Sequence, residues 1–284
     1  MLFNIIKKKN AGFKIPASFS TGAKKAVTWS PEVTLYFSRF VINPPLDVMI
    51  KLAAFIDGLV AAGVYSKIDE MWMLANNNST NALLGIKNKK NCSVIGAPTF
   101  TVNRGYTGNF LNTDCLNTNF IPSVDGVNFT LNNGSLGVYS RTSQASSRVD
   151  IGGQAAASNC SGFMSGNTTV ANSRCAINQS GFAGSLTTSS ANTLGLQVLS
   201  RTNSTTLRIF KGSLFFSQSF TVDSALTNKN IYILANNNNG VIASSCAKEL
   251  SFAFIGGTLT DANISSIASL IEVYLDYIGA GVMP

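Results

Sequence analysis

Histidine is absent from this chain of 284 residues, and charge of either sign is scarce. Without an imidazole base, neither a Ser–His–Asp nor a Cys–His nucleophile can be assembled, and the commonest metal ligand is missing. Charged residues make up 12% of the chain, whereas about 25% is usual. These absences predict a protein that is not an enzyme, with no catalytic residues, no cofactor and no metal site. A Ser–Lys or carboxylate mechanism is the alternative that they leave open.

Acidic residues are especially sparse in the central part of the chain. Glycoside hydrolysis requires two carboxylates that face each other across a cleft. Between residues 98 and 258 the acids are Asp114, Asp125, Asp150, Asp223 and Glu249. No E-x-D-x-x-E strand occurs among them, and Asp114 and Asp125 lie in segments typical of turns. A polysaccharide depolymerase is therefore the least favoured of the functions considered.

The five cysteines do not form a recognisable framework. Their number is odd and no CxxC pair occurs, so neither a zinc site nor a disulfide scaffold is indicated. We expect small buried hydrophobic side chains in a reducing compartment.

No membrane or export segment is predicted. The first residues, MLFNIIKKKN, place apolar residues before the basic ones, unlike a signal peptide. The most apolar stretch, residues 46–63, is short and contains three charged residues, so no membrane span is expected.

The chain is rich in asparagine, and its basic residues are unevenly distributed. It contains 30 Asn, many in runs such as ANNNST and ANNNNG, and carries a net charge of +8. Residues 1–45 hold seven basic residues and one acid, which accounts for +6 of that charge. No basic stripe with interleaved aromatic residues follows, so nucleic acid is not an expected partner.

The middle of the chain is typical of an all-β protein. Strand-like runs of five to eight residues recur between Gly, Asn and Ser clusters, among them PTFTV, NFTLN, SLGVYSRT, RVDIGG, LGLQVLSRT, TLRIFKG, GSLFFSQSF, NIYILANN and ELSFAFIGG. Such a series predicts an antiparallel two-sheet jelly-roll sandwich.

Two amphipathic helices flank these strands. Residues 44–62 and 260–278 repeat apolar residues with helical spacing, and Thr260 is the expected N-cap of the second helix. Residues 1–42 show no helical period, and residues 32–42 alternate as a strand does. We therefore divide the chain into an extended basic and aromatic N-terminal arm, 1–42, and a jelly-roll domain, 43–284.

The order of these segments resembles a known family. WMLANNNSTNALLGIKN, PTFTVNRGYTGN, LNTNFIPSVDG, NFTLNNGSLGVYSRT, RIFKG and AFIGGTLTDANISSIASLIEVYLDYIG follow one another across residues 45–280. This succession resembles the concanavalin A-like, or LamG-like, jelly-roll modules of bacteriophage virion structural proteins. The resemblance implies a two-sheet sandwich carried on a virion, as a component of a head or tail appendage.

Within that resemblance we expect the arm to attach the protein to neighbouring subunits. Its partners would be other virion proteins and further copies of the chain, in a closed oligomer such as a trimer. Exposed aromatic side chains on an arm need a surface to cover them. The predicted docking residues are Phe3, Lys7, Lys8, Lys9, Phe13, Phe19 and Trp29.

The alternative function is a lectin-like module that binds a host surface glycan. Sugar recognition needs an exposed aromatic ring beside polar side chains. The candidates beside Asn- and Arg-rich loops are Arg104, Tyr106 and Tyr139. The competing hypothesis for Arg104 and Tyr106 is a structural role at a corner of the sandwich.

Overall fold

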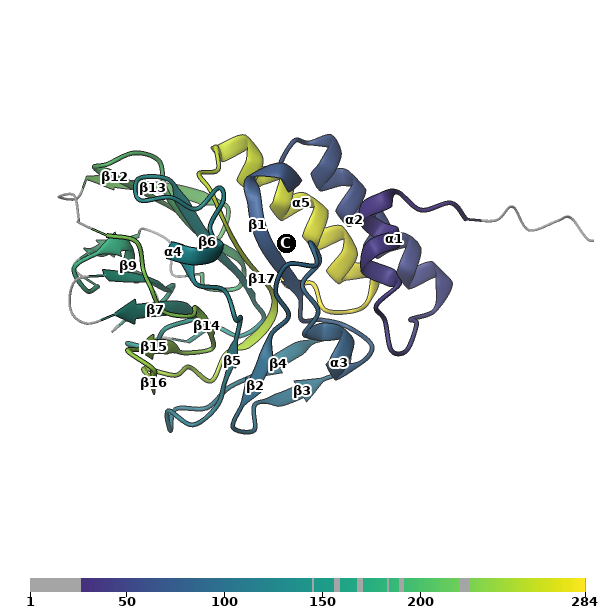
Figure 1. Ribbon diagram of the computed structural model, residues 1–284, viewed down its shortest axis with the longest axis horizontal. Coiled ribbons are helices and arrows are strands. Elements are labelled where there is room, and N and C mark those ends of the chain that lie inside the picture. Colours follow the sequence, from purple (N-terminus) through teal and green to yellow (C-terminus); the bar gives the residue numbers. More distant parts are fainter. Residues whose placement is uncertain are drawn as a thin grey trace, which may run out of the picture.

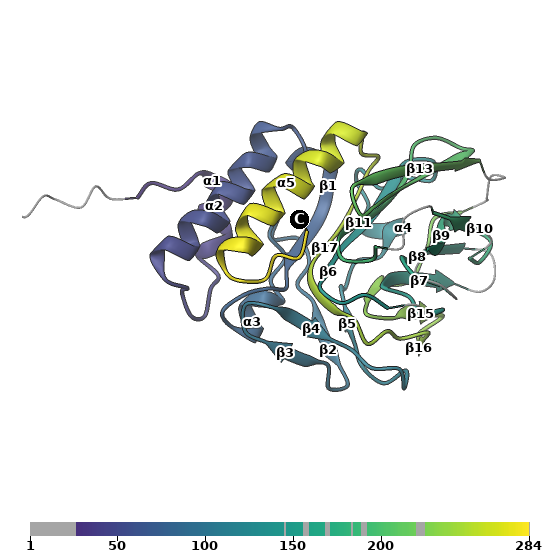
Figure 2. The ribbon, with the colours of Figure 1, turned by 180° about the vertical axis from the view of Figure 1, so that it is seen from behind.

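The computed structural model describes residues 27–144, 146–155, 159–167, 171–182, 184–188, 192–219 and 225–283. Its architecture has three layers: a group of helices, a first sheet and a second sheet (Figure 1). The helices α1, α2 and α5 lie together on one side of the molecule, and Figure 2 shows the same order of layers from behind. The predicted mainly-β, two-sheet antiparallel sandwich with flanking helices is confirmed.

The sheet next to the helices, here called sheet A, runs in the order β13-β12-β11-β6-β17-β4-β3, with β1 also paired to β17. All of its pairs are antiparallel. Its strands are β1 (Ile68–Met73), β3 (Thr99–Thr101), β4 (Gly105–Thr107), β6 (Gly134–Ser140), β11 (Gly195–Arg201), β12 (Thr206–Lys211), β13 (Leu214–Ser219) and β17 (Glu249–Gly256).

The second sheet, sheet B, runs in the order β10-β9-β8-β7-β14-β5-β2, with β15 paired to β7 and β16 paired to β15. Only the β15–β7 pair is parallel among the strand pairs of the described residues. Its strands are β2 (Ser93–Ile95), β5 (Cys115–Asn117), β7 (Ile151–Ala155), β8 (Asn159–Met164), β9 (Asn172–Gln179), β10 (Gly184–Thr187), β14 (Tyr232–Ile233), β15 (Asn236–Asn238) and β16 (Val241–Ala243).

Sheet A is apolar on both faces because it lies between two layers. In β17, Phe252 and Phe254 pack against the helices, whereas Ala253 and Ile255 pack between the sheets. Side chains alternate in the same way along β1, where the ring of Trp72 lies between the sheets. Each strand in the middle of sheet A therefore contributes to two separate cores, and this explains the long apolar runs in the sequence.

The two flanking helices form close to their predicted positions. Helix α2 spans Leu46–Ala61 and helix α5 spans Asp261–Tyr277. Thr260 caps α5 in a reciprocal pair with Asn263, as a capping box does. The remaining short helices are α3 (Ser79–Ala82), α4 (Pro122–Asp125) and the 3-10 turn Tyr65–Lys67.

The end of the predicted arm is not extended. Residues Pro31–Phe37 form helix α1, which packs on α2. The Ser30 side chain accepts a hydrogen bond from the Val33 amide, and Pro31 occupies the first turn, where its missing N–H costs nothing. The strand predicted for residues 32–42 is therefore wrong: a capped helix buries Val33, Tyr36 and Phe37 against the body.

All five cysteines are free and buried, which confirms their expected role as core side chains. Among the described residues, the helices are too short or too polar to cross a bilayer.

Candidate functional site

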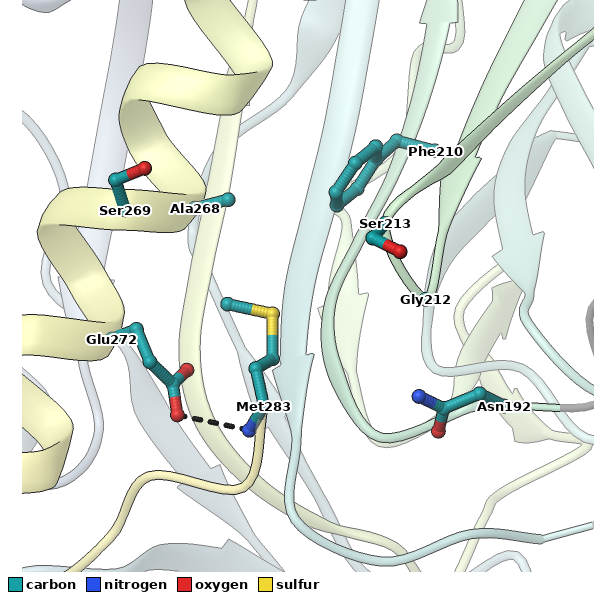
Figure 3. A pocket seen from close by; sticks show the side chains of 8 residues that line it. All are labelled: Asn192, Phe210, Gly212, Ser213, Ala268, Ser269, Glu272 and Met283. Atoms are coloured by element: carbon teal, nitrogen blue, oxygen red, sulfur yellow. Dashed lines mark hydrogen bonds between the residues drawn. The ribbon is translucent and has the colours of Figure 1, made fainter.

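A pocket of about 260 Å³ opens between helix α5 and the β12–β13 end of sheet A (Figure 3). Its wall on the helix side comes from α5, its opposite wall from the turn after β12, and the segment after α5 runs between them. It is lined by Asn192, Phe210, Gly212, Ser213, Ala268, Ser269, Glu272 and Met283.

The β12–β13 hairpin builds the sheet side of the pocket. Leu207 and Ile209 of β12 point between the sheets, so Phe210 faces the helices, with its ring 4.9 Å from that of Phe215. The turn residues Gly212 and Ser213 both have positive φ, 54° and 73°. Two such residues match the tight hairpin turn that follows the twist of the strands. Ser213 is strained there, and its exposed hydroxyl lies at the rim.

Glu272 of α5 supplies a carboxylate to the pocket. Its Oε2 accepts a hydrogen bond from the Tyr139 hydroxyl at 2.5 Å, and its Oε1 accepts one from the Met283 amide at 2.9 Å. The Val282 amide donates to the same tyrosine oxygen at 2.8 Å. Burial raises the pKa of the Glu272 carboxyl, although these hydrogen bonds act in the opposite direction. The acid is thus held in a fixed position with acceptor capacity remaining.

The segment after α5 forms the third side. Met283 lies against Gly195, where a Cβ would overlap its side chain. In Figure 3 the Met283 thioether lies between α5 and Phe210. The pocket therefore combines a phenyl ring, a thioether, a carboxylate, an amide and two hydroxyls.

Of the predicted glycan-binding residues, two are buried. Tyr106 is 3% exposed and donates to the Ser79 carbonyl; Tyr139 is 0% exposed and faces the helices. Neither offers a ring on which a sugar can stack. Arg104 is half exposed and makes a two-pronged ion pair with Glu249, 2.7 Å at its closest.

Most of the predicted docking residues, Phe3, Lys7, Lys8, Lys9, Phe13 and Phe19, lie outside the described residues. Trp29 is described, and its ring packs edge-on against Phe37 at 5.3 Å. It therefore contacts its own body.

Two of the acids considered for hydrolysis, Asp125 and Asp114, have structural partners, and Asp223 lies outside the described residues. Asp125 accepts from the Ile121 amide and pairs with Lys90, while Asp114 accepts from the Ala97 amide. Within the described part of the chain, no group of acidic or cysteine side chains is arranged to hold a metal ion.

A buried charged cluster joins the two sheets at one end. Asp150, before β7, pairs with Lys248, before β17, at 2.9 Å, and both are almost fully buried. Lys248 Nζ also donates to Ser165 Oγ at 2.6 Å, and Lys211 Nζ donates to the Ser165 carbonyl at 2.6 Å. Burial, with the nearby Lys248 charge, lowers the pKa of Lys211 to about 8. A Ser–Lys contact exists here, but Ser165 is 0% exposed. The cluster is therefore part of the interior of the protein.

No protein-family model matches the chain, and no curated protein matches it significantly. Among solved structures, it is similar to a mutant of Trypanosoma rangeli sialidase with trans-sialidase activity, at 10% identity and a TM-score of 0.53. The match covers 83% of this chain and 39% of the sialidase chain, so the protein spans about two fifths of that length.

Two further likenesses are weaker. Domain 4 of an extracellular arabinanase from Geobacillus stearothermophilus, solved with arabinotriose, has 11% identity and a TM-score of 0.44, over 71% of this chain and 98% of that one. The binding domain of botulinum neurotoxin serotype D has 13% identity and a TM-score of 0.43, over 71% and 52%. Together with the sheet order, the sialidase likeness places the fold among jelly-roll β-sandwiches.

The comparison corrects one expectation. The sequence predicted a protein that is not an enzyme, but the solved chain of similar fold is a sialidase mutant with trans-sialidase activity, which is an enzyme. The absence of histidine and of a paired acid was therefore too weak a basis for that prediction. At 10% identity the likeness informs the fold alone.

Proposed function

We propose that this protein is a lectin-like module that binds a glycan, with one sugar ring held in the pocket between α5 and the β12–β13 hairpin. The observation that carries the proposal is that the partly exposed Met283 side chain and the anchored carboxylate of Glu272 meet in one cavity, which the largely buried ring of Phe210 also lines. A sugar ring has an apolar C–H face and a rim of hydroxyls, and this lining offers a partner to each.

The size of the pocket favours a single ring. Ligand pockets for drug-sized molecules start at about 300 Å³, and this one measures about 260 Å³. The exposed side chains of Asn192, Ser213 and Ser269 at the rim can contact the next sugar of a chain. A terminal sugar inside, followed by weaker rim contacts, is the binding mode we infer.

The test is a glycan array followed by calorimetry with the best ligand. Ser269→Trp places a large side chain at the mouth and should abolish binding. Ser265→Trp makes the same change one turn earlier on α5, where the side chain lines a groove toward Gly58 of α2; Ser269 lines both this groove and the pocket, whereas Ser265 lines only the groove. It should bind as the wild type does. Equal binding by both variants, or no glycan bound at all, would refute this function.

We also propose that the module is carried on a bacteriophage virion, where it contacts neighbouring subunits. The likenesses give this setting no support; it rests on the sequence resemblance and on exposed apolar side chains on the outer helices. These include Leu46 and Ile50 of α2 and Val273 of α5, at 55%, 43% and 61% exposure. Mass spectrometry of purified particles from the source should find the chain at a fixed ratio to the major shell protein. Its absence from particles would end this proposal and leave the glycan proposal intact.

A further inference from the structure

Three charged side chains meet on sheet A, close along β6 to the tyrosine that contacts the pocket wall. Arg104 lies in the turn between β3 and β4, Arg141 directly follows β6, and Glu249 begins β17. The Arg141 amide donates to the Glu249 carbonyl at 2.8 Å, which places the two residues side by side. Arg141 comes two residues after Tyr139, whose hydroxyl contacts Glu272 in the pocket wall. Because strand side chains alternate, both belong to the face covered by the helices.

The charges of this group do not balance. Arg104 holds Glu249 through both its Nε and Nη2 atoms, at 3.0 and 2.7 Å. Arg141 Nη1 approaches the same carboxylate only to 3.8 Å. Two guanidinium groups thus share one carboxylate, which leaves one positive charge in excess.

Arg141 carries that excess. Its side chain is 10% exposed, and its Nε and Nη1 atoms are buried without a hydrogen-bond partner. Burial and the charge of Arg104 lower the pKa of Arg141. A buried donor without an acceptor is unfavourable, and more so when it is charged. No hydrogen bond to these two atoms has to break when the guanidinium turns toward an incoming acceptor.

We propose that Arg141, assisted by Arg104, forms an anion subsite that takes the carboxylate of an acidic sugar. The inference rests on the proposed glycan function and specifies the ligand as an acidic glycan. One surplus charge suits a monoanion, and a guanidinium fork matches the two oxygens of a carboxylate. Arg141 is one step along β6 from Tyr139, so the subsite and the pocket can be occupied by neighbouring sugars of one chain.

The experiment follows the Arg141 Nε–H resonance by NMR, identified by its loss in Arg141→Gln. Sodium glucuronate is titrated into the full chain at constant ionic strength, with glucose and dimethyl phosphate as comparison probes. Glucuronate should shift the resonance and glucose should not. A response to dimethyl phosphate but not to glucuronate would replace the sugar carboxylate with a phosphodiester and overturn the assignment.

Two variants distinguish the contribution of the forked guanidinium geometry from that of positive charge alone. Arg141→Lys keeps the charge but loses the fork, and should weaken glucuronate binding at least about tenfold, as loss of a charge-assisted hydrogen bond does. Its binding is read from backbone amide shifts near Glu249. Arg174→Gln removes one charge from sheet B, where Arg174 donates to the Phe182 carbonyl, and should change nothing.

The two proposals fail separately. If neutral glycans bind in the pocket and glucuronate leaves Arg141 unmoved, the anion subsite is wrong and the glycan function stands. If glucuronate shifts Arg141 while Ser269→Trp leaves all glycan binding unchanged, the subsite is real and the pocket assignment is wrong.

Discussion

The two faces of sheet A differ in how completely they are covered. The face toward sheet B is closed by aliphatic, aromatic and cysteine side chains such as Leu136, Phe163 and Cys175, all fully buried. The face toward the helices is closed only in part: α2 and α5 cover its middle, and at its margins lie the pocket and the Arg141 group. Two pleated surfaces interdigitate along their whole length, whereas helices on a twisted sheet leave gaps at its edges. The candidate binding groups lie in those gaps.

The largest loss of stability is expected when a ring is removed from the closed face, between the two sheets. Phe163→Ala removes a fully buried ring between the sheets and should lower the free energy of unfolding by about 3–5 kcal/mol. Phe215→Ala removes the same atoms from a half-buried ring on the helix side, and should cost about half as much because less of the ring leaves water. Urea unfolding of both variants measures the difference. Equal losses would mean that the two faces are equally well packed.

A smaller effect is expected in the pH dependence of the unfolding free energy. Folding lowers the pKa of Lys211 to about 8, so the folded chain binds fewer protons than the unfolded chain between that value and the ordinary lysine pKa of about 10.4. The contribution of Lys211 to stability should therefore rise over that interval, by up to about 3 kcal/mol. Lys211→Met should remove this rise. Because folding raises the pKa of the five buried cysteines, which acts in the opposite direction, the quantity to measure is the difference in unfolding free energy between the wild type and Lys211→Met. A difference that does not shift in favour of the wild type from pH 8 to 10 would contradict the burial of this charge.

The smallest loss of stability is expected in helix α5, which covers part of the helix side of sheet A. Thr260→Ala removes the cap of α5 and should cost about 1 kcal/mol. Ser266→Ala, on the same helix but outside the cap, should be close to neutral. Thermal unfolding followed by circular dichroism measures both. Equal melting temperatures for the two variants would show that the capping box contributes nothing.

The sequence predicted the architecture well because its signals are local. The strand-like runs that become β6, β11, β12, β13 and β17 are separated by Gly and Asn clusters. Thr260 marks the start of α5. In residues 31–37 the alternation misled, although Ser30 and Pro31 carry the start signal of a helix. The strand predicted at 128–132 fails for another reason: Asp69 accepts the Asn128 and Phe129 amides, which removes them from strand pairing.

The candidate site was largely beyond sequence reasoning. Glu272, Phe210 and Met283 lie more than ten residues apart from one another and meet only because α5 crosses the end of sheet A. Glu272 lies beyond residue 258, outside the strand-rich stretch in which a pair of acids was sought. The sequence singled out Arg104 from its place beside a turn, but the state of Arg141 depends on burial, which no local pattern reveals.

The most direct test of the account is an NMR titration of the full chain with the best glycan from the array. We predict shifts confined to the amides of Ser213, Ser269 and Met283 around the pocket and of Arg141, while amides of β7 and β8 in sheet B stay unchanged. Shifts that map to sheet B and spare the pocket would contradict it.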